Sequence, residues 1–276
     1  FHEDITGKEI TSHLLNAVKK LKNVRMYEYT TLLDILCDGS KCCGGIIRWP
    51  DGREEQVEAD YVILATGGIG GTYKHSTNFK HLTGDGVEIA RRHNIELKNL
   101  DYVQIHPTTL YSDNKEERSF LISESVRGEG ARLYDKNMNR FVDELLPRDL
   151  LTQEIYKQME KDGTDFVWED LRTIPRDELI SHFPNIIEHC SQAGYDVFHE
   201  CIPIVPAQHY FMGGIKVNHN SKTSMDHLYA VGETACNGVH GKNRLASNSL
   251  LESLVFAKRA ANLIKEQWCL EKEQAV

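Results

Sequence analysis

The run Tyr61–Ala65 (Tyr-Val-Ile-Leu-Ala) constrains the fold more than any other segment, because it is short, continuous and apolar. Such a run is typical of a strand that is buried on both faces of a parallel sheet. It ends in a glycine-rich loop, residues 66–71, which suits either a close backbone approach to a ligand or an ordinary tight turn. Helix and strand signals interleave along the chain, so we predict an α/β or α+β fold.

Hydrophobic periodicity and turn residues predict the remaining elements. Helices are expected over Thr6–Leu21 (with a capping box from Thr6 to Glu9), Val87–His93, Asp149–Lys161, Arg176–Ser181, Pro184–Ala193 and Ser249–Trp268. Strands are expected over Val24–Tyr29, Thr31–Cys37, Gly44–Trp49, Arg53–Glu58, Ile215–Val217 and Leu228–Val231, with a hairpin turn at residues 50–52.

Charge and cysteine usage exclude several classes of function. The net charge of −9 over 276 residues disfavours nucleic-acid binding. No apolar run approaches the length of a membrane span, and no signal peptide is visible. The seven cysteines show no CxxC pair and no zinc-like spacing, so we expect no metal site and reduced thiols in a cytoplasmic protein. Cys42 and Cys43 are expected in or beside a hairpin, and we assign them no chemistry.

The stretch Gly238–Glu252 is the strongest candidate for a binding element. It places an arginine, serines, asparagines and glycines in one polar loop, directly before an apolar segment, Leu250–Ile264. The free N–H groups and the positive dipole end of a helix that starts here would suit an anionic or polar ligand. An ordinary core helix, with Ser247, Asn248 or Ser249 as its N-cap, explains the same residues equally well.

Each of several other polar residues could have either a functional or a structural role. Asp85 lies between two glycines before a helix, where it could cap that helix or accept a hydrogen bond from a ligand hydroxyl. His106 and His209 could bind a carboxylate or carry a proton, but single histidines are often structural. Arg148, next to Pro147, would ordinarily be a solvated surface residue. Together with Arg244 these histidines could clamp a dicarboxylate, although spacing alone does not show that they meet.

Several motifs, taken in order, resemble the succinate dehydrogenase/fumarate reductase flavoprotein family. They are Ala-Thr-Gly-Gly at 65–68, Thr-Gly-Asp-Gly at 83–86, Gln-x-His-Pro-Thr at 104–108, Glu-x-x-Arg-Gly-Glu-Gly at 124–130, Pro-Arg-Asp at 147–149, His-Tyr-x-Met-Gly-Gly-Ile at 209–215, Gly-Glu at 232–233 and Asn-Arg-Leu-Ala-Ser-Asn-Ser-Leu-Leu-Glu at 243–252. The resemblance covers nearly the whole chain. Ala-Ser-Asn-Ser-Leu-Leu-Glu at 246–252 favours the branch of the family that oxidises L-aspartate.

The resemblance implies an FAD-binding domain interrupted by a capping domain. The FAD-binding parts would be residues 1–100 and 209–265, the capping (substrate) domain 101–208, and 266–276 the start of a C-terminal region. The family's Gly-x-Gly-x-x-Gly element, which cradles the FAD pyrophosphate, belongs upstream of Phe1, and a helical domain belongs after the last helix. We therefore expect a partial FAD-binding domain that binds FAD weakly or not at all and is of uncertain activity.

The resemblance also implies roles for ten residues. Cofactor contacts fall on Asp85, Glu233, Ser249 and Leu250, substrate contacts on His106, Ser123, Glu124, His209 and Arg244, and proton transfer on Arg148. Arg244 and His209 would hold one carboxylate, and His106 with Ser123 the other.

The implied reaction is oxidation of L-aspartate to iminoaspartate, with hydride passing to the flavin and electrons then to oxygen or fumarate. This is the first step of de novo NAD synthesis, with quinolinate synthase as a partner in the pathway. Two alternatives remain: a fumarate reductase or succinate dehydrogenase flavoprotein, and a non-catalytic fragment that folds without flavin.

Overall fold

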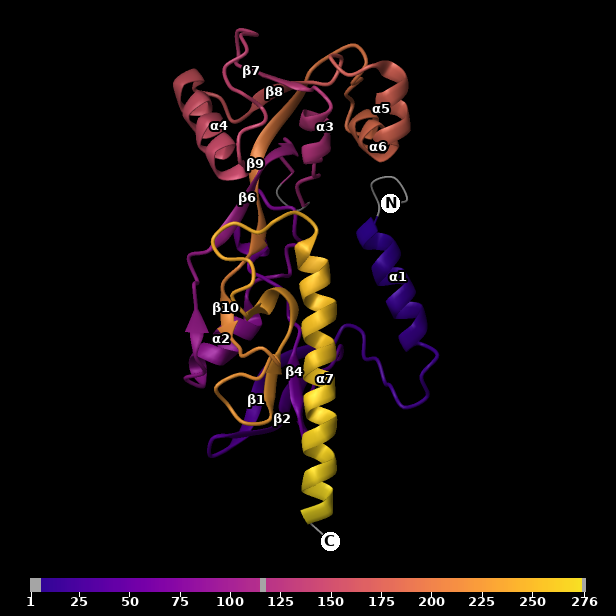
Figure 1. Ribbon diagram of the computed structural model, residues 1–276, viewed down its shortest axis with the longest axis vertical. Helices are drawn as coiled ribbons and strands as arrows, with labels where there is room; N and C mark the ends of the chain where they lie inside the picture. Colours follow the sequence, from indigo (N-terminus) through magenta and orange to yellow (C-terminus); the bar gives the residue numbers. More distant parts are fainter. Residues whose placement is uncertain (1–5, 115–117, 275–276) are drawn as a thin grey trace. The chain divides into compact units, whose positions relative to one another are not determined.

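The structure is a computed structural model that describes residues 6–114 and 118–274. The chain divides into two compact units. Unit 1 comprises Phe1–Val24, Gly71–His81 and Ile105–His209, and unit 2 comprises Arg25–Gly70, Leu82–Gln104 and Tyr210–Val276. Each unit contains both helices and strands (Figure 1), so the predicted mixed α/β class is confirmed. The assignment of residues 101–208 to a capping domain stays a prediction.

Unit 1 is organised by a four-stranded sheet in the order β6-β9-β8-β7, in which β8 runs antiparallel to β7 and β9. The strands are β6 (Val103–Leu110), β7 (Arg132–Tyr134), β8 (Val167–Asp170) and β9 (Ile202–Phe211). The helices are α1 (Thr6–Val18), α3 (Glu124–Gly128), α4 (Arg148–Asp162), α5 (Arg176–His182) and α6 (Pro184–Gln192), with a short η1 turn (Gly70–Thr72). Helices α5 and α6 lie side by side (Figure 1).

A single apolar cluster forms the core of unit 1. Strand residues such as Leu133 and Ile204 pack there with helix residues such as Leu151 and Ile155, and these four side chains are fully buried. Helix α4 supplies two of them, Leu151 and Ile155. The helix begins directly after Pro147 and ends at Gly163, whose φ of 65° is left-handed.

Unit 2 contains three smaller sheets. Strands β1 (Thr31–Asp38), β2 (Lys41–Arg48) and β3 (Glu54–Glu58) form an antiparallel sheet, and the predicted hairpin turn joins β2 to β3. Strand β4 (Val62–Leu64) pairs in parallel with β11 (Leu228–Ala230), which confirms the predicted parallel strand, although only Leu64 of β4 is buried. A third sheet has the order β12-β10-β5 and consists of β5 (Leu97–Lys98), β10 (Gly214–Lys216) and β12 (Ala235–Cys236).

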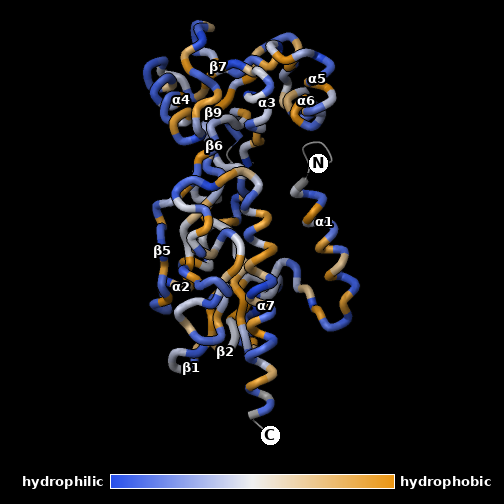
Figure 2. Tube along the Cα trace, in the orientation of Figure 1, coloured by the Kyte–Doolittle hydropathy of each residue, from blue (hydrophilic) through white to orange (hydrophobic). Residues whose placement is uncertain are grey.

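Two helices and a short turn complete unit 2. They are α2 (Asp85–Arg92), the η2 turn (Gly232–Thr234) and α7 (Asn248–Gln274). Residues of β1, β4, α2, β10 and β11 share one apolar core, which includes Ile35, Leu64, Ile89, Ile215 and Leu228. Along α7, hydrophobic and hydrophilic residues alternate, as Figure 2 shows. Among the described residues, no helix is both long enough and apolar enough to cross a bilayer.

Some sequence predictions were wrong or incomplete. No strand forms at Val24–Tyr29: this segment is exposed at Met26 and Tyr27, Tyr29 has a left-handed φ of 56°, and Tyr27 packs its ring edge-on against Trp49 instead. The long strands β6 and β9 were missed. The proposed capping box depends on the side chain of Thr6, which lies outside the described side chains.

Replacing Leu133 with alanine tests the core of unit 1. Because Leu133 is fully buried, Leu133→Ala should lower the free energy of unfolding by about 2–5 kcal/mol. Leu145→Ala is the matched control, since Leu145 is 67% exposed and should change stability by no more than about 0.5 kcal/mol. Urea denaturation followed by circular dichroism measures both, and equal effects would contradict this description of the core.

Candidate active-site residues in the two units

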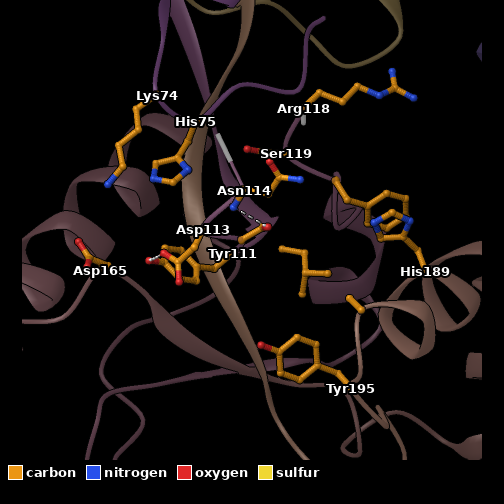
Figure 3. Close-up of a pocket in the computed structure, with 14 residues that line it drawn as sticks. Lys74, His75, Tyr111, Asp113, Asn114, Arg118, Ser119, Asp165, His189 and Tyr195 are labelled. Carbon is orange, nitrogen blue, oxygen red and sulfur yellow. Dashed lines mark hydrogen bonds between the residues drawn. The ribbon is translucent and has the colours of Figure 1, made fainter. Parts of the chain in front are cut away.

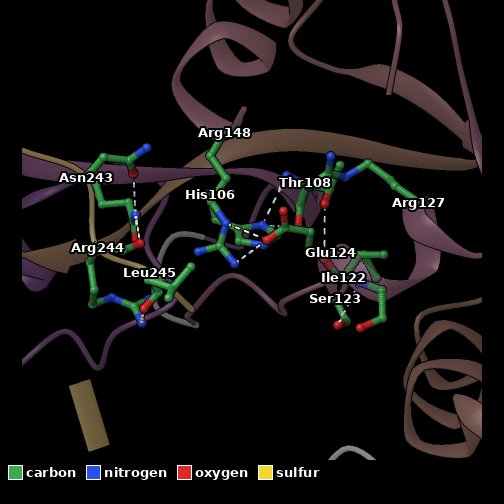
Figure 4. Close-up of polar contacts among 12 residues, drawn as sticks. His106, Thr108, Ile122, Ser123, Glu124, Arg127, Arg148, Asn243, Arg244 and Leu245 are labelled. Carbon is green, nitrogen blue, oxygen red and sulfur yellow. Dashed lines mark hydrogen bonds and ion pairs between the residues drawn. The ribbon is translucent and has the colours of Figure 1, made fainter. Parts of the chain in front are cut away.

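Five of the ten predicted site residues lie in unit 1, and an ion pair joins two of them. Arg148, the first residue of α4, donates from Nε to Oε2 of Glu124 at 2.7 Å, and its Nη2 lies 2.6 Å from the same oxygen (Figure 4). The Arg148 side chain is only 12% exposed, whereas that of Glu124 is 49% exposed. The Arg148 guanidinium is therefore fixed by an ion pair and mostly shielded from solvent, unlike the solvated surface arginine that its position would ordinarily suggest.

The two predicted histidines of unit 1 also meet. The rings of His106 on β6 and His209 on β9 lie 5.4 Å apart at an interplanar angle of 67°. His106 is 1% exposed, its Nδ1 lies 2.9 Å from the Thr108 carbonyl, and its Nε2 has no hydrogen-bond partner among the described residues. Burial, together with His209 and Arg148, lowers the pKa of His106 well below its usual range, so the ring is neutral at pH 7.

The position of Ser123 follows from strand β6. Thr108 donates its hydroxyl to the Ile122 carbonyl at 3.0 Å, and the Ile122 N–H donates back to the Thr108 carbonyl at 3.2 Å. These bonds place the start of α3 beside the histidine-bearing strand. Ser123 is the N-cap of α3, and its hydroxyl accepts a hydrogen bond from the Ser125 N–H at 3.3 Å.

A buried carboxylate that sequence reasoning missed fixes the loop before Arg148. Glu144 has a fully buried side chain that accepts hydrogen bonds from the Leu133 N–H at 3.0 Å and from Arg140 Nη2 at 2.6 Å. Its backbone carbonyl accepts a 2.6 Å bond from Nη1 of the buried Arg127, on the same helix as Glu124. Glu144 thus joins α3, β7 and the loop that leads into α4. Only the Glu-x-x-Arg spacing at 124–127 hinted at this.

A second buried carboxyl, Glu169 on β8, lies near Arg127. Its side chain is fully buried, and neither carboxyl oxygen has a hydrogen-bond partner among the described residues. Burial raises the pKa of Glu169 to about 8, even though the positive charge of Arg127 acts in the opposite direction. The folded protein therefore holds Glu169 in its neutral form at pH 7.

In unit 2, Arg244 occupies a polar loop that Gln104 holds. The Gln104 amide donates from Nε2 to the Asn243 side chain at 2.7 Å and to the Arg244 carbonyl at 2.8 Å. The Arg244 guanidinium lies over the Tyr210 ring, 4.8 Å from its centroid, and the residue is only 5% exposed. A buried arginine with a fixed backbone suits the recognition of a carboxylate.

The same loop is fastened to helix α7 through Glu252. Asn237 donates from Nδ2 to Oε1 of Glu252 at 2.5 Å, and Glu252 is buried. Ser247 precedes α7 with a left-handed φ of 67°, and the Leu250 N–H donates to the Ser247 carbonyl at 3.2 Å. The helix begins at Asn248, so Ser249 and Leu250 lie in its first turn, as predicted.

The predicted cofactor residues Glu233 and Asp85 differ in their surroundings. Glu233 accepts a 2.8 Å hydrogen bond from the Phe211 N–H, and burial raises its pKa to about 7. Gly68 is required beside it, because a Cβ on Gly68 would lie 2.4 Å from Glu233 Oε1. Asp85 is exposed in the first turn of α2 and accepts a 2.6 Å bond from the Thr83 hydroxyl. At Gly68 the glycine-rich loop therefore serves close packing within the protein.

A cavity of about 470 Å³ in unit 1 contains none of the ten predicted residues. Figure 3 shows His75, Tyr111, Asp113 and Ser119 around it. The Tyr111 hydroxyl donates to Asp113 at 2.6 Å, so part of the polar lining is already paired. We assign this cavity no role in the reaction.

Comparison with known proteins identifies the family. Residues 2–250 match the family model described as FAD binding domain. The chain belongs to this family. The resemblance to the succinate dehydrogenase/fumarate reductase flavoproteins is thereby confirmed, and FAD is the cofactor of the family.

Curated relatives and a solved structure show the same relationship. The chain is 52% identical over 261 residues to L-aspartate oxidase of Clostridium perfringens, covering 95% of this chain and 59% of that protein. It is 49% identical over 261 residues to L-aspartate oxidase of Clostridium acetobutylicum, covering 95% and 60%. A quinol fumarate reductase variant from E. coli superposes with a TM-score of 0.87 at 32% identity, covering 96% of this chain and 49% of that chain. The chain thus spans about three fifths of the length of these two oxidases.

The residues of unit 2 fit part of an FAD site. Helix α7 begins with half-buried polar residues after the left-handed Ser247, and a helix start favours a ligand acceptor atom. Asp85, exposed in the first turn of α2, offers a carboxylate to a hydroxyl group. We therefore retain Asp85, Glu233, Ser249 and Leu250 as the residues that would contact FAD.

The Glu144 network makes a prediction about stability. Glu144→Ala would leave the Leu133 N–H buried without its acceptor and remove the carboxylate that Arg140 binds. We expect the free energy of unfolding to fall by about 2 kcal/mol or more. Glu154→Ala is the control, because the exposed Glu154–Lys157 pair should contribute less than about 1 kcal/mol. Denaturant titration that finds equal losses would show that Glu144 does not fix this loop.

Glu169 makes a prediction about pH. Its pKa rises from 4.5 to about 8 on folding, so over this range the unfolded chain loses a proton that the folded chain keeps. Stability therefore decreases as the pH rises through this window. Glu169→Gln removes that dependence, and its stability relative to the wild type should improve steadily from pH 4.5 to pH 8. Urea titrations across this range measure the difference, and parallel curves for the two proteins would contradict a neutral buried Glu169.

Proposed function

We propose that this chain forms the substrate-binding part and a portion of the FAD-binding part of an L-aspartate oxidase, which converts L-aspartate to iminoaspartate. The observation that carries the proposal is the Arg148–Glu124 ion pair, in the same unit as the buried, neutral His106, whose ring lies 5.4 Å from that of His209. The 52% identity to an L-aspartate oxidase supports the choice of substrate.

The unit 1 residues would bind one end of the dicarboxylate and handle its proton. In the tautomer whose Nδ1 accepts from the Thr108 N–H at 3.2 Å, a neutral His106 carries its one proton on Nε2 and can donate it to a carboxylate. Ser123 offers a hydroxyl directly after Ile122, whose carbonyl is bonded to Thr108 on the same strand as His106. The Arg148 guanidinium is a positively charged N–H donor, which suits the role of an acid or of a stabiliser of negative charge. The Glu124 carboxylate, which touches Arg148 and is half exposed, is the group that can take up a proton beside it.

The unit 2 residues would bind a carboxylate group and contact the cofactor. Arg244 offers N–H groups that can pair with a carboxylate through two parallel hydrogen bonds. FAD, when bound, supplies the acceptor for the substrate's hydride, and oxygen or fumarate would then take the electrons. Glu233, buried near Arg244, would help to orient the cofactor-binding segment through its bond to the Phe211 N–H.

Two further functions deserve comparison. The TM-score of 0.87 to a quinol fumarate reductase favours fumarate reduction or succinate oxidation as the alternative reaction. The second alternative is a chain that folds but neither binds flavin nor turns over substrate alone.

The remaining assignments belong to the same proposal. Iminoaspartate formation would begin de novo NAD synthesis, with quinolinate synthase as the partner that consumes the product. We place the protein in the cytoplasm on the strength of its expected reduced cysteines.

A chimeric enzyme tests the function. The matching residues of the C. perfringens L-aspartate oxidase are replaced by this chain, and aspartate-dependent reduction of fumarate is measured together with flavin absorbance. We expect flavin binding and turnover with aspartate. Turnover with succinate in place of aspartate, measured with oxygen and not fumarate as the electron acceptor, would favour the fumarate reductase alternative. A folded chimera that binds flavin but oxidises neither substrate would overturn the proposal.

Within the chimera, Arg148→Leu should lower kcat at least about a hundredfold while flavin stays bound. Arg176→Leu is a matched control, because Arg176 begins α5 directly after Pro175 just as Arg148 begins α4 after Pro147. The control should retain near-normal kcat. Loss of activity in both variants, or in neither, would remove Arg148 from the proposed role.

A further inference from the structure

A cysteine, a histidine and an aspartate form a connected row in unit 2, on β1 and at the end of α2. Cys37 Sγ lies 3.5 Å from Nδ1 of His93, and Nε2 of His93 lies 2.7 Å from Oδ1 of Asp34. Cys37 is exposed to solvent, whereas the His93 and Asp34 side chains are 25% and 29% exposed. None of these three residues belongs to the ten predicted site residues.

The hydrogen bonds select one tautomer of His93. Because Asp34 is an acceptor, His93 carries its proton on Nε2 and leaves a lone pair on Nδ1 toward the Cys37 thiol. Asp34 is itself held by the Ile35 N–H at 2.9 Å and lies 3.6 Å from Nη2 of Arg92. A base that touches the thiol, and is oriented by a carboxylate, is the arrangement that activates cysteine nucleophiles.

A second thiol lies opposite Cys37 on the neighbouring strand. Cys37 and Cys42 are register partners in the β1–β2 hairpin, and residues directly opposite each other share one face of a sheet. The Cys42 N–H donates to the Asp226 carbonyl at 2.8 Å, so it is not used toward Cys37. Non-hydrogen-bonded pairs have Cα atoms about 4.5 Å apart, inside the range of about 4.4–6.8 Å in which a disulfide closes.

The surroundings of both sulfurs place them at the margin of the unit 2 core. Cys37 Sγ lies 3.7 Å from Met225 Sδ, and both Met225 and the fully buried Cys42 belong to that core. A small reagent in solution can therefore reach Cys37, whereas burial shields Cys42 from direct reaction with that reagent. Cys42 would react only with the oxidised sulfur of Cys37.

We propose that Cys37 is a site of oxidation by hydroperoxides, in which His93 accepts the thiol proton and Cys42 completes a cross-strand disulfide. This inference does not depend on flavin or on the proposed oxidation of aspartate.

The oxidation balances as two steps. First, His93 takes the Cys37 proton, the sulfur attacks hydrogen peroxide, an S–O bond forms and the O–O bond breaks, and the leaving hydroxide is protonated to water. Second, the Cys42 sulfur attacks the Cys37 sulfenic acid, an S–S bond forms and the S–O bond breaks, and a second water leaves. Two thiols are oxidised by two electrons, and one peroxide is reduced to two waters.

The acidity of Cys37 explains why a base is needed. Burial, with Cys42, Cys43 and Asp34 nearby, raises the pKa of the Cys37 thiol, so it is protonated at neutral pH. A thiol of raised pKa is slow to react unaided, but its thiolate is intrinsically the stronger nucleophile once formed. Removing the base should therefore slow the reaction at neutral pH and matter less at high pH.

The test treats the full 276-residue chain with hydrogen peroxide, blocks the remaining thiols at timed intervals, and identifies the modified peptides by mass spectrometry. We expect Cys37 and Cys42 to be lost together as one cross-linked peptide, and faster than Cys269, the exposed cysteine on α7 that serves as the internal control. In Cys42→Ala, a sulfenic acid should be trapped by dimedone on Cys37.

Two variants separate the base from a merely structural role. His93→Gln should slow Cys37 oxidation about tenfold or more at pH 7, with recovery toward the wild-type rate as the pH is raised. If His93→Gln has a lowered melting temperature, Asp34→Asn is used in its place, because it keeps His93. This variant should also slow the oxidation of Cys37 at pH 7. Oxidation of Cys37 no faster than Cys269, cross-linking to a cysteine other than Cys42, or an unchanged rate in a folded variant would each overturn the proposal.

Discussion

The placement of Arg148 depends on a carboxylate that is not itself a predicted site residue. Glu144 is buried in unit 1, where an uncompensated charge would be costly. Burial alone would raise its pKa, but hydrogen bonds from Arg140 and from the Leu133 N–H outweigh that effect and lower it. Because the Glu144 carbonyl also accepts from Arg127, the same residue links helix α3, which carries Glu124, to the loop that leads to Arg148.

In unit 2, backbone pairing between strands joins chain segments that are distant in sequence. The parallel pairing of β4 with β11 joins residues 62–64 to residues 228–230. The η2 turn follows β11 directly, so Glu233 is carried to its position beside Gly68 and accepts the Phe211 N–H. The Glu233 carboxylate can thus occupy its position only because residue 68 is a glycine without a Cβ atom.

Local patterns predicted the helices well because their information is local. The helix predicted over Asp149–Lys161 agrees with α4 within one residue at each end. Strands β6 and β9 were missed because they are buried along most of their length, so they lack alternation, and each contains proline, as at Pro107 and Pro203. The strand predicted at Val24–Tyr29 had suitable residues but no partner edge.

The site residues show the same division between local and long-range information. Motif resemblance named Arg148 and Glu124, yet their ion pair spans 24 positions in sequence and could not be read from spacing. Glu144 went unnoticed, and Gln104 was named only as part of a motif, because a buried polar residue looks like a surface residue until its partners are known. The row from Cys37 through His93 to Asp34 likewise combines a hairpin with a helix end 59 positions away.

The hydrogen bond from Asn237 to Glu252 closes the loop between these two residues at both of its ends. It ties together positions 15 residues apart, one just before the loop and one in the first turns of α7. Changes to exposed positions between these two residues, such as Lys242, need not shift the helix that follows. In protein engineering, and over evolution, loops of different composition could be exchanged between these two fixed ends while the rest of unit 2 keeps its fold.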